Sequence, residues 1–253
     1  MITAFLFIIL TGCVLKHHGK PDAVIAIDLT SPGKTFPRNL YWGMMAEIKG
    51  DSIAKGGSET GNLNTALDLA TKMIVMENNT DSVQKNADTS VLLKMSDLKT
   101  NKGMFVDNGR QSFYTPAFFT LKMFSENRPD KWMPVKVSFK GEDSSGKGFS
   151  VTAGTHEKSG LVIIKMVNVF NTSRHCQIVL NYKQQIKYKG EEIVMTSGNI
   201  LDGNSFKAPE KVVPMTKDVN GLKNTFDYEC PANAIVIIHL RYKKGINGFV
   251  DCC

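Results

Sequence analysis

Glu47 is the residue of this sequence whose type and position are best suited to chemistry. It lies near the end of the apolar run Leu40–Ile48 (LYWGMMAEI), which is typical of a buried strand. A carboxylate at the carboxyl end of such a strand can donate or accept a proton or contact a polar ligand. Glu47 is therefore the one candidate for a catalytic or ligand-contacting carboxylate.

Two polar turns offer further candidates. Asp107 and Asn108 follow the strand-like run Met104–Val106 and could line a cleft, but Asp-Asn before a glycine is more typical of a plain turn. The turn Asp202–Ser205 carries oxygen atoms that could bind calcium or a sugar. We expect this turn instead to shape the loop that precedes Val212.

Histidine and cysteine residues give no predicted metal site. His156 and His175 lie in predicted loops, far from each other in sequence, and we assign neither a catalytic role. No Cys-x-x-Cys pair or histidine cluster accompanies the five cysteines, which are Cys13, Cys176, Cys230, Cys252 and Cys253. No metal and no cofactor is predicted. In an oxidising compartment the last four cysteines have three possible pairings, of which Cys176 with Cys230 is preferred.

The first residues, MITAFLFIILTGC, indicate export. The apolar run Ile2–Leu10 is shorter than the about 20 residues that span a bilayer and suits a signal-peptide core. Leu10–Cys13 also resembles a lipobox, in which Cys13 would carry a lipid. Residues 1–13 are thus predicted to be a signal peptide or a lipoprotein signal, and the protein to be secreted or extracellular, with or without a lipid anchor. The run carries no Lys or Arg, so a buried amino-terminal strand is the alternative.

The composition narrows the class of protein. Of 253 residues, 42% are hydrophobic and 22% charged, which is ordinary for a globular protein and argues against long disorder or several membrane spans. The net charge is +7, but basic residues are scattered and do not alternate with aromatic ones. We therefore expect no nucleic-acid partner.

The first half of the chain contains two predicted helices. Across Asn62–Asn78 apolar residues recur at spacings of three and four, which indicates an amphipathic helix. Thr115 and Pro116 supply the N-cap and the first turn of a second helix that ends near Asn127. A short strand, Ala23–Leu29, precedes both helices.

From residue 132 onward the pattern changes to short strands separated by turns. The predicted strands are Val135–Phe139, Phe149–Ala153, Leu161–Val169, Gln177–Tyr182, Glu192–Thr196, Thr225–Tyr228 and Ala234–Arg241. Seven such strands predict a β-sandwich or jelly roll over residues 131–245. The fold class is therefore mainly β with some α, and the boundary between residues 23–130 and the sandwich lies near Asp130.

Four blocks of the sequence, in order, resemble family 51 α-L-arabinofuranosidases. Ile27–Gly57 is similar to the family's opening strand and first barrel strand, and Gly61–Val83 to a late barrel helix. Tyr114–Asp130 is similar to the final barrel helix. The strands that include Val162–Val169 and Cys230–Leu240 are similar to the closing sandwich. Within the last block, Thr196–Pro214 (TSGNILDGNSFKAPEKVVP) resembles a signature of the family's closing domain.

The resemblance implies a (β/α)8 barrel joined to a jelly roll that the amino-terminal strand completes. Here the match passes from the start of the barrel to its end between about Gly57 and Gly61. Only 88 residues lie from Leu40 to Asn127, whereas a closed barrel takes at least about 200. Residues 23–130 are therefore predicted to be an incomplete remnant of the barrel that contributes one strand to the sandwich.

The chemistry that the resemblance implies is retaining glycoside hydrolysis, which needs two carboxyl groups about 5 to 5.5 Å apart. The family's acid/base Glu follows Gly-Asn, but here Gly61-Asn62, Gly198-Asn199 and Gly203-Asn204 precede Leu, Ile and Ser. The resemblance aligns Glu47 with the family's Glu that contacts bound arabinose. A rival alignment matches the segment around Glu47 to the strand that carries the nucleophile. No catalytic residue is predicted, and Glu47 is the predicted substrate-binding residue.

The resemblance predicts an arabinofuranosidase-like glycosidase that is truncated and catalytically impaired, with an arabinose-containing polysaccharide as its partner. The alternative is a non-catalytic sandwich that binds polysaccharide or a protein. We also expect self-association, because a missing barrel would leave the apolar helix faces around Leu67, Met73, Phe119 and Phe124 uncovered.

Overall fold

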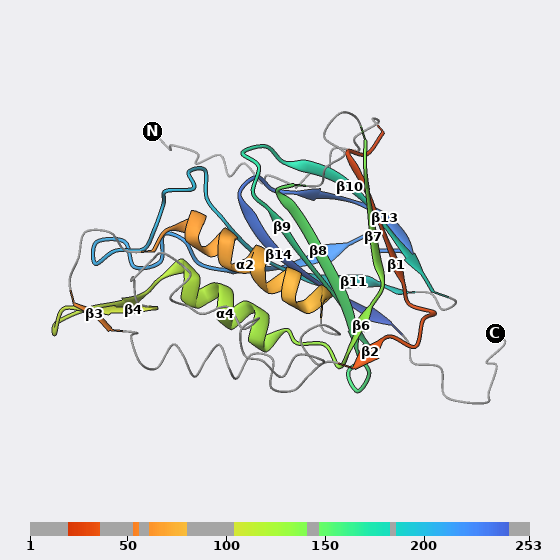
Figure 1. Ribbon diagram of the computed structural model, residues 1–253, viewed down its shortest axis with the longest axis horizontal. Helices are drawn as coiled ribbons and strands as arrows, with labels where there is room; N and C mark the ends of the chain where they lie inside the picture. The colour runs from red at the N-terminus through yellow and green to blue at the C-terminus, as the bar shows by residue number, and fades with distance from the viewer. Residues whose placement is uncertain are drawn as a thin grey trace, which may run out of the picture.

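The computed structural model describes residues 20–35, 53–55, 61–79, 104–140, 147–182 and 186–242 (Figure 1). The predicted strand at Leu40–Ile48 and the predicted signal at residues 1–13 lie outside these ranges. In the described part of the chain, neither helix is long and apolar enough to cross a membrane.

The first sheet of the sandwich has four strands in the order β13-β10-β1-β7. Their bounds are β1 Ala23–Asp28, β7 Val135–Phe139, β10 Arg174–Asn181 and β13 Thr225–Cys230. Strand β1 pairs in parallel with β10 and antiparallel with β7. The amino-terminal strand therefore lies inside the sheet, where it joins β7 to the other strands.

The second sheet has seven strands in the order β12-β11-β14-β9-β8-β6-β2. Their bounds are β2 Lys34–Thr35, β6 Lys131–Met133, β8 Phe149–His156, β9 Leu161–Asn168, β11 Ile186–Thr196, β12 Met215–Asn220 and β14 Ala234–Tyr242. The central strands β9 and β14 are buried on both faces, which explains their nearly continuous apolar sequences.

The two sheets enclose one hydrophobic core. Residues of β1 and β10, including Ile25 and Ile178, meet residues of β9 and β14, including Ile164 and Val236, and these four are 0% exposed. Alternate residues of each strand point into this layer, as two packed sheets require. The predicted mainly β fold with a sandwich is confirmed.

Two helices cover the outer face of the seven-stranded sheet (Figure 1). They are α2, Leu63–Asn78, and α4, Pro116–Glu126. Their apolar residues share a second core with Ile163 and Val167 of β9 and with Ile235 and Ile237 of β14. The described chain is thus built in three layers, with the seven-stranded sheet in the middle.

The expected uncovered helix faces are not observed, and that expectation was wrong. Leu67, Met73 and Phe124 are at most 1% exposed, and Phe119 is half-buried. The physical reason is that the outer face of β9 and β14 supplies the apolar surface that these helices need. The described helices therefore give no basis for the expected self-association.

A small third sheet lies beside the helices. Its strands, in the order β3-β4-β5, are Ile53–Lys55, Phe105–Asp107 and Ser112–Tyr114. Strand β3 pairs in parallel with β4, and β5 leads directly into α4 through Thr115. The hydroxyl of Thr115 accepts a hydrogen bond from the Phe118 N–H at 3.5 Å, as an N-cap does.

The N-cap of α2 gives a first testable prediction. The Asn62 side chain accepts hydrogen bonds at 3.1 Å from both the N–H and the hydroxyl of Thr65. Replacing Asn62 with alanine should lower the free energy of unfolding by about 1 kcal/mol, because the helix loses its cap. Urea denaturation measures this change, and Asn62→Asp, which keeps a capping oxygen, should retain most of the stability. Equal losses in both variants would contradict a capping role.

Candidate functional site

Glu47 lies outside the described residues, and so does the junction at residues 57–60. The predicted contact of Glu47 with a substrate therefore stays a prediction. The described part of the chain does show what the signature segment Thr196–Pro214 does, because this segment contacts the start of α2.

The signature segment connects β11 to β12 and meets the start of α2. Leu63 donates its backbone N–H to the Asp202 carbonyl, and Asn64 donates to the Ile200 carbonyl, both at 2.8 Å. The first N–H groups of a helix have no partner within the helix, so they need acceptors from elsewhere. The sandwich loop supplies these acceptors and so fixes the N-terminus of α2.

Gly203 allows the loop and the helix to approach each other. Asn62 and Gly203 form an isolated antiparallel bridge. A Cβ atom on Gly203 would lie 2.9 Å from the Gly61 carbonyl oxygen, which is closer than real Cβ atoms come to backbone atoms. Glycine is therefore required here because of space, and the sequence Gly-Asn at this position serves packing.

Asn204 uses its whole side-chain amide on backbone groups. Its Oδ1 atom accepts from the Val212 N–H at 2.7 Å, and its Nδ2 atom donates to the carbonyls of Val212 at 3.0 Å and Tyr114 at 2.9 Å. Asn204 is 1% exposed. It closes the signature loop on itself and also ties the loop to the end of β5, which agrees with the expected role of shaping the loop before Val212.

Asp202 is held on the other side of the same turn. Its carboxylate accepts a hydrogen bond from the Ser197 hydroxyl and pairs with the Lys211 Nζ atom at 2.6 Å. The hydrogen bond from Lys211, followed by that from Ser197, lowers the pKa of Asp202. Both carboxylate oxygens of Asp202 are thus bonded to other residues of the loop. The turn therefore has a structural role in the contact between the sandwich and α2.

The turn at Asp107 and Asn108 connects β4 to β5. The Asp107 Oδ1 atom accepts from the Gly109 N–H at 2.8 Å, and the Asn108 Oδ1 atom accepts from the N–H groups of Arg110 and Gln111. Gly109 has a φ of +81°, a conformation that favours glycine. The prediction of a plain turn is confirmed.

The two histidines lie in separate surroundings. His156 Nε2 is 3.9 Å from an Asp130 oxygen, and His175 Nε2 is 3.7 Å from an Asp227 oxygen. Among the residues that the structure describes, no group of three or more His, Cys, Asp and Glu side chains could hold a metal ion.

The preferred pairing of Cys176 with Cys230 was wrong, because both are free buried thiols. In the register of β10 and β13, Cys176 faces Tyr228 while Cys230 faces Arg174. The two cysteines are therefore diagonal neighbours, and diagonal residues of a sheet are about 7 to 8 Å apart, beyond the reach of a disulfide. Burial raises the pKa of Cys176 to about 12, so this thiol is a poor nucleophile.

A buried ion pair joins α2 to the sandwich. Lys165 of β9 and Glu77 of α2 are at most 1% exposed, and their Nζ and Oε1 atoms are 2.8 Å apart. The Nζ atom also lies 4.6 Å from the centre of the Phe124 ring and 5.4 Å from that of Trp132. Burial raises the pKa of Glu77 to about 7, against the charge of Lys165, and burial lowers the pKa of Lys165.

This pair was missed from the sequence, although one signal for it was present. Lys165 interrupts the apolar run VIIKMVNV, and a lysine inside a strand that is buried on both faces needs a partner. Its partner lies 88 residues away on a helix. Only the packing of α2 on β9 shows which carboxylate that is.

A second buried carboxylate, Glu192 of β11, links the two sheets. It accepts a hydrogen bond from the Tyr228 hydroxyl of β13 and pairs with Lys217 of β12 at 2.6 Å. Burial, more than the nearby cysteines, raises the pKa of Tyr228. Glu77 and Glu192 thus both serve structural links between layers.

These features define a class of protein: a β-sandwich whose seven-stranded sheet carries two helices on its outer face. The family model for the α-L-arabinofuranosidase C-terminal domain matches residues 42–234. The chain therefore belongs to the family of the α-L-arabinofuranosidase C-terminal domain.

Known relatives agree with this assignment. Over 190 residues the chain is 26% identical to α-L-arabinofuranosidase 2 of Arabidopsis thaliana, and over 192 residues it is 26% identical to α-L-arabinofuranosidase 1 of the same plant. Each match covers 75% of this chain and only 28% of the relative. The chain therefore spans a minor part of the length of these relatives.

Solved structures show the same fold. An arabinose-bound GH51 α-L-arabinofuranosidase superimposes with a TM-score of 0.59 at 15% identity, over 86% of this chain and 36% of the other. The α-L-arabinofuranosidase of Thermotoga maritima in its arabinose complex gives a TM-score of 0.53 at 11% identity, over 79% of this chain and 48% of the other.

Proposed function

We propose that this chain is an arabinofuranosidase-like protein that does not itself hydrolyse glycosides. Its family suggests terminal α-L-arabinofuranosyl groups of arabinan or arabinoxylan as the sugars with which it interacts. The chain keeps the sandwich and the helices that pack on it, and it lacks the middle of the barrel that would carry the reaction.

The observation that carries this proposal is the absence of a Gly-Asn-Glu sequence. Retaining hydrolysis needs an acid/base carboxyl group about 5 to 5.5 Å from the nucleophile. All three Gly-Asn pairs of the chain precede residues without a carboxyl group, and two of these pairs lie in the signature segment. There Gly203 and Asn204 serve packing and hydrogen bonding between the layers.

An aryl α-L-arabinofuranoside tests the proposal directly. We expect the purified full chain to release no aryl alcohol above a blank. Glu47 is the one candidate carboxylate, and a single carboxylate cannot act as both nucleophile and acid. The variants Glu47→Gln and Glu126→Gln should likewise release no aryl alcohol. Glu126→Gln is the control, since it changes only an exposed helix residue.

Turnover by the unaltered chain that Glu47→Gln abolishes and Glu126→Gln leaves intact would overturn the proposal. Such a result would place Glu47 on the nucleophile and would require a second carboxyl group from another part of the chain or from another molecule.

We also propose that the protein is exported, on the support of the apolar run and the lipobox-like Leu10–Cys13. Amino-terminal sequencing and mass spectrometry of the protein from its own cells test this. A mature start after residue 13, or a lipid on Cys13, is the expected result. An intact Met1 in protein recovered from inside the cells would contradict export.

A further inference from the structure

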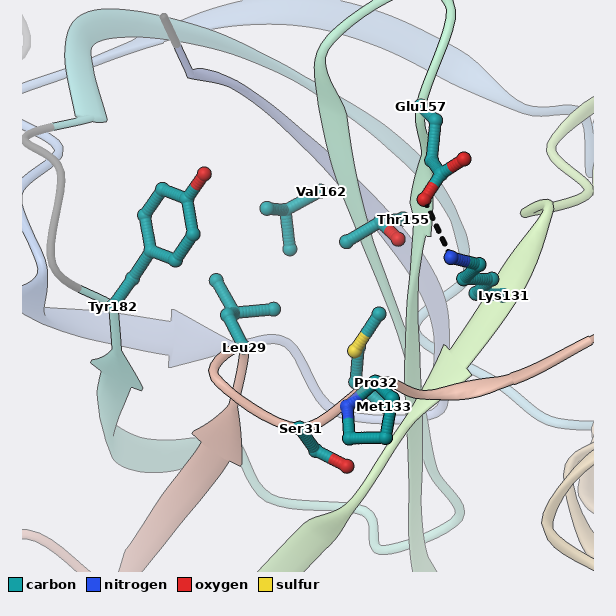
Figure 2. Close-up of a pocket in the computed structure, with 9 residues that line it drawn as sticks. All are labelled: Leu29, Ser31, Pro32, Lys131, Met133, Thr155, Glu157, Val162 and Tyr182. Carbon is teal, nitrogen blue, oxygen red and sulfur yellow. Dashed lines mark ion pairs between the residues drawn. The ribbon is translucent and has the colours of Figure 1, made fainter. Parts of the chain in front are cut away.

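A cavity of about 180 Å³ lies at one end of the sandwich, where strands β1 and β10 finish (Figure 2). These strands are parallel, so the residues that follow them, Leu29 and Tyr182, lie at the same end, and Leu29 donates its N–H to the Asn181 carbonyl at 3.0 Å. The opposite wall comes from β6, β8 and β9 of the other sheet. The cavity thus forms where the two sheets separate.

The floor of the cavity is apolar. Leu29 and Val162 lie between Tyr182 on one side and Thr155 on the other, and Met133 closes the wall beside them (Figure 2). Leu29 is 8% exposed and Val162 is 0% exposed, so both belong to the core of the sandwich. The Tyr182 ring adds a planar surface, and its backbone carbonyl is held by the Asn224 Nδ2 atom at 2.9 Å.

The polar groups of the cavity are hydroxyl groups and one ion pair. Tyr182, Thr155 and Ser31 contribute hydroxyl groups. Lys131 and Glu157 form an ion pair at 2.7 Å beside Thr155 (Figure 2). The described lining therefore has one positive and one negative charge and no net charge, and it offers hydrogen-bond donors and acceptors around an apolar floor.

We propose that this cavity binds a single sugar ring at the end of a polysaccharide chain. A sugar ring is neutral, with hydroxyl groups at its edge and C–H groups on its faces. The hydroxyl groups match Thr155 and the Lys131–Glu157 pair. The C–H groups match Leu29, Val162 and the electron-rich face of Tyr182.

Size and charge favour this ligand over others. The cavity is smaller than the roughly 300 to 1,000 Å³ of sites for drug-sized ligands, which suits one ring. An anionic ligand would meet the Glu157 carboxylate, and a cationic one would meet the Lys131 ammonium group. The identity of the sugar as arabinose rests on the proposed function, whereas the presence of a sugar site rests on the cavity.

Affinity electrophoresis of the full chain in gels that contain arabinan tests the inference, with arabinose-free xylan in a second set of gels. We expect retardation on arabinan, and a fall in affinity of about tenfold in Tyr182→Ala, because the ring surface is lost while the backbone carbonyl remains. Thr155→Val, which keeps the size of the side chain, should weaken binding as well. Tyr114→Ala is the matched control, since Tyr114 is 44% exposed and does not line the cavity.

Urea denaturation of each variant confirms that it is folded, and Glu157→Gln, which changes an exposed side chain, is a further variant that should fold normally. Absence of retardation on both polymers would overturn the inference, as would equal losses in Tyr182→Ala and Tyr114→Ala. Retardation on xylan alone, lost in Tyr182→Ala, would overturn the assignment to arabinose. Hydrolysis of the aryl arabinofuranoside would contradict the proposed function and leave this site standing.

Discussion

Replacing Glu77 with glutamine is expected to lower the free energy of unfolding by about 3 to 5 kcal/mol at neutral pH, because it leaves Lys165 buried without a charged partner. Lys165→Met should cost a similar amount, since Glu77 must then either stay buried as an unpaired charge or take up a proton, and both cost free energy at neutral pH. Denaturation in urea measures both. Glu126→Gln, on the exposed side of the neighbouring helix, should change stability by no more than about 1 kcal/mol.

The two single variants should respond to pH in opposite directions. In Glu77→Gln the folded protein holds Lys165 at a lowered pKa, so it binds fewer protons than the unfolded chain, and stability rises as the pH rises toward 10.5. In Lys165→Met the pKa of Glu77 is raised in the folded protein, from 4.5 to about 7 with Lys165 present and further without it. Stability then rises as the pH falls toward 4.5.

The double variant Glu77→Leu with Lys165→Met completes the test. Replacing a buried ion pair by apolar residues of similar volume is often neutral or stabilising, so the double variant should recover most of the stability that either single variant loses. Additive losses in the double variant would show that Glu77 and Lys165 do not act as a pair.

Asn204→Ala is expected to lower the free energy of unfolding by about 3 kcal/mol or more. The change removes three hydrogen bonds and leaves the buried N–H and carbonyl of Val212 without their partner, and each buried group left unsatisfied costs about 1 to 3 kcal/mol. Asn199→Ala in the same loop removes one exposed hydrogen bond to the Leu201 N–H and should cost about 1 kcal/mol or less.

Hydrogen exchange shows whether Asn204 acts through the layer contact. The N–H groups of Leu63 and Asn64 are bonded to carbonyls of the signature loop, so Asn204→Ala should speed their exchange more than that of amides within β9. A stability loss with unchanged exchange at Leu63 and Asn64 would contradict the role of this loop in fixing α2.

Much of the fold could be predicted from the sequence, because strong local signals coincide with its elements. Thr115 and Pro116 gave the start of α4, and the spacing of apolar residues gave α2. Strand β7 was predicted with its observed bounds. The polar strand β12 was missed, since most of its residues are exposed and it shows no alternation of apolar and polar side chains.

What the sequence could not give was the partner of each surface. The apolar face of α2 was visible, but either a barrel or a sandwich could have covered it. The apolar runs of β9 and β14 indicated burial on both faces without showing what lies on the second face. The same holds for the candidate site. The polar turn at Asp202 was recognised from the sequence, but its contact with the start of α2 and the pairing of Glu77 with Lys165 depend on tertiary packing.

The position of β1 also sets an order for the synthesis of this protein. Asp28 at the end of β1 and its neighbour Asn181 on β10 are 153 residues apart, and among the described strands of this sheet β7 pairs with β1 alone. Translation begins at the amino terminus, so β1 leaves the ribosome long before β10 exists, and its apolar residues must wait uncovered. Closure of the sandwich is then a late, long-range event, of the kind that slows folding, and until it occurs the apolar residues of β1 are open to association with other chains.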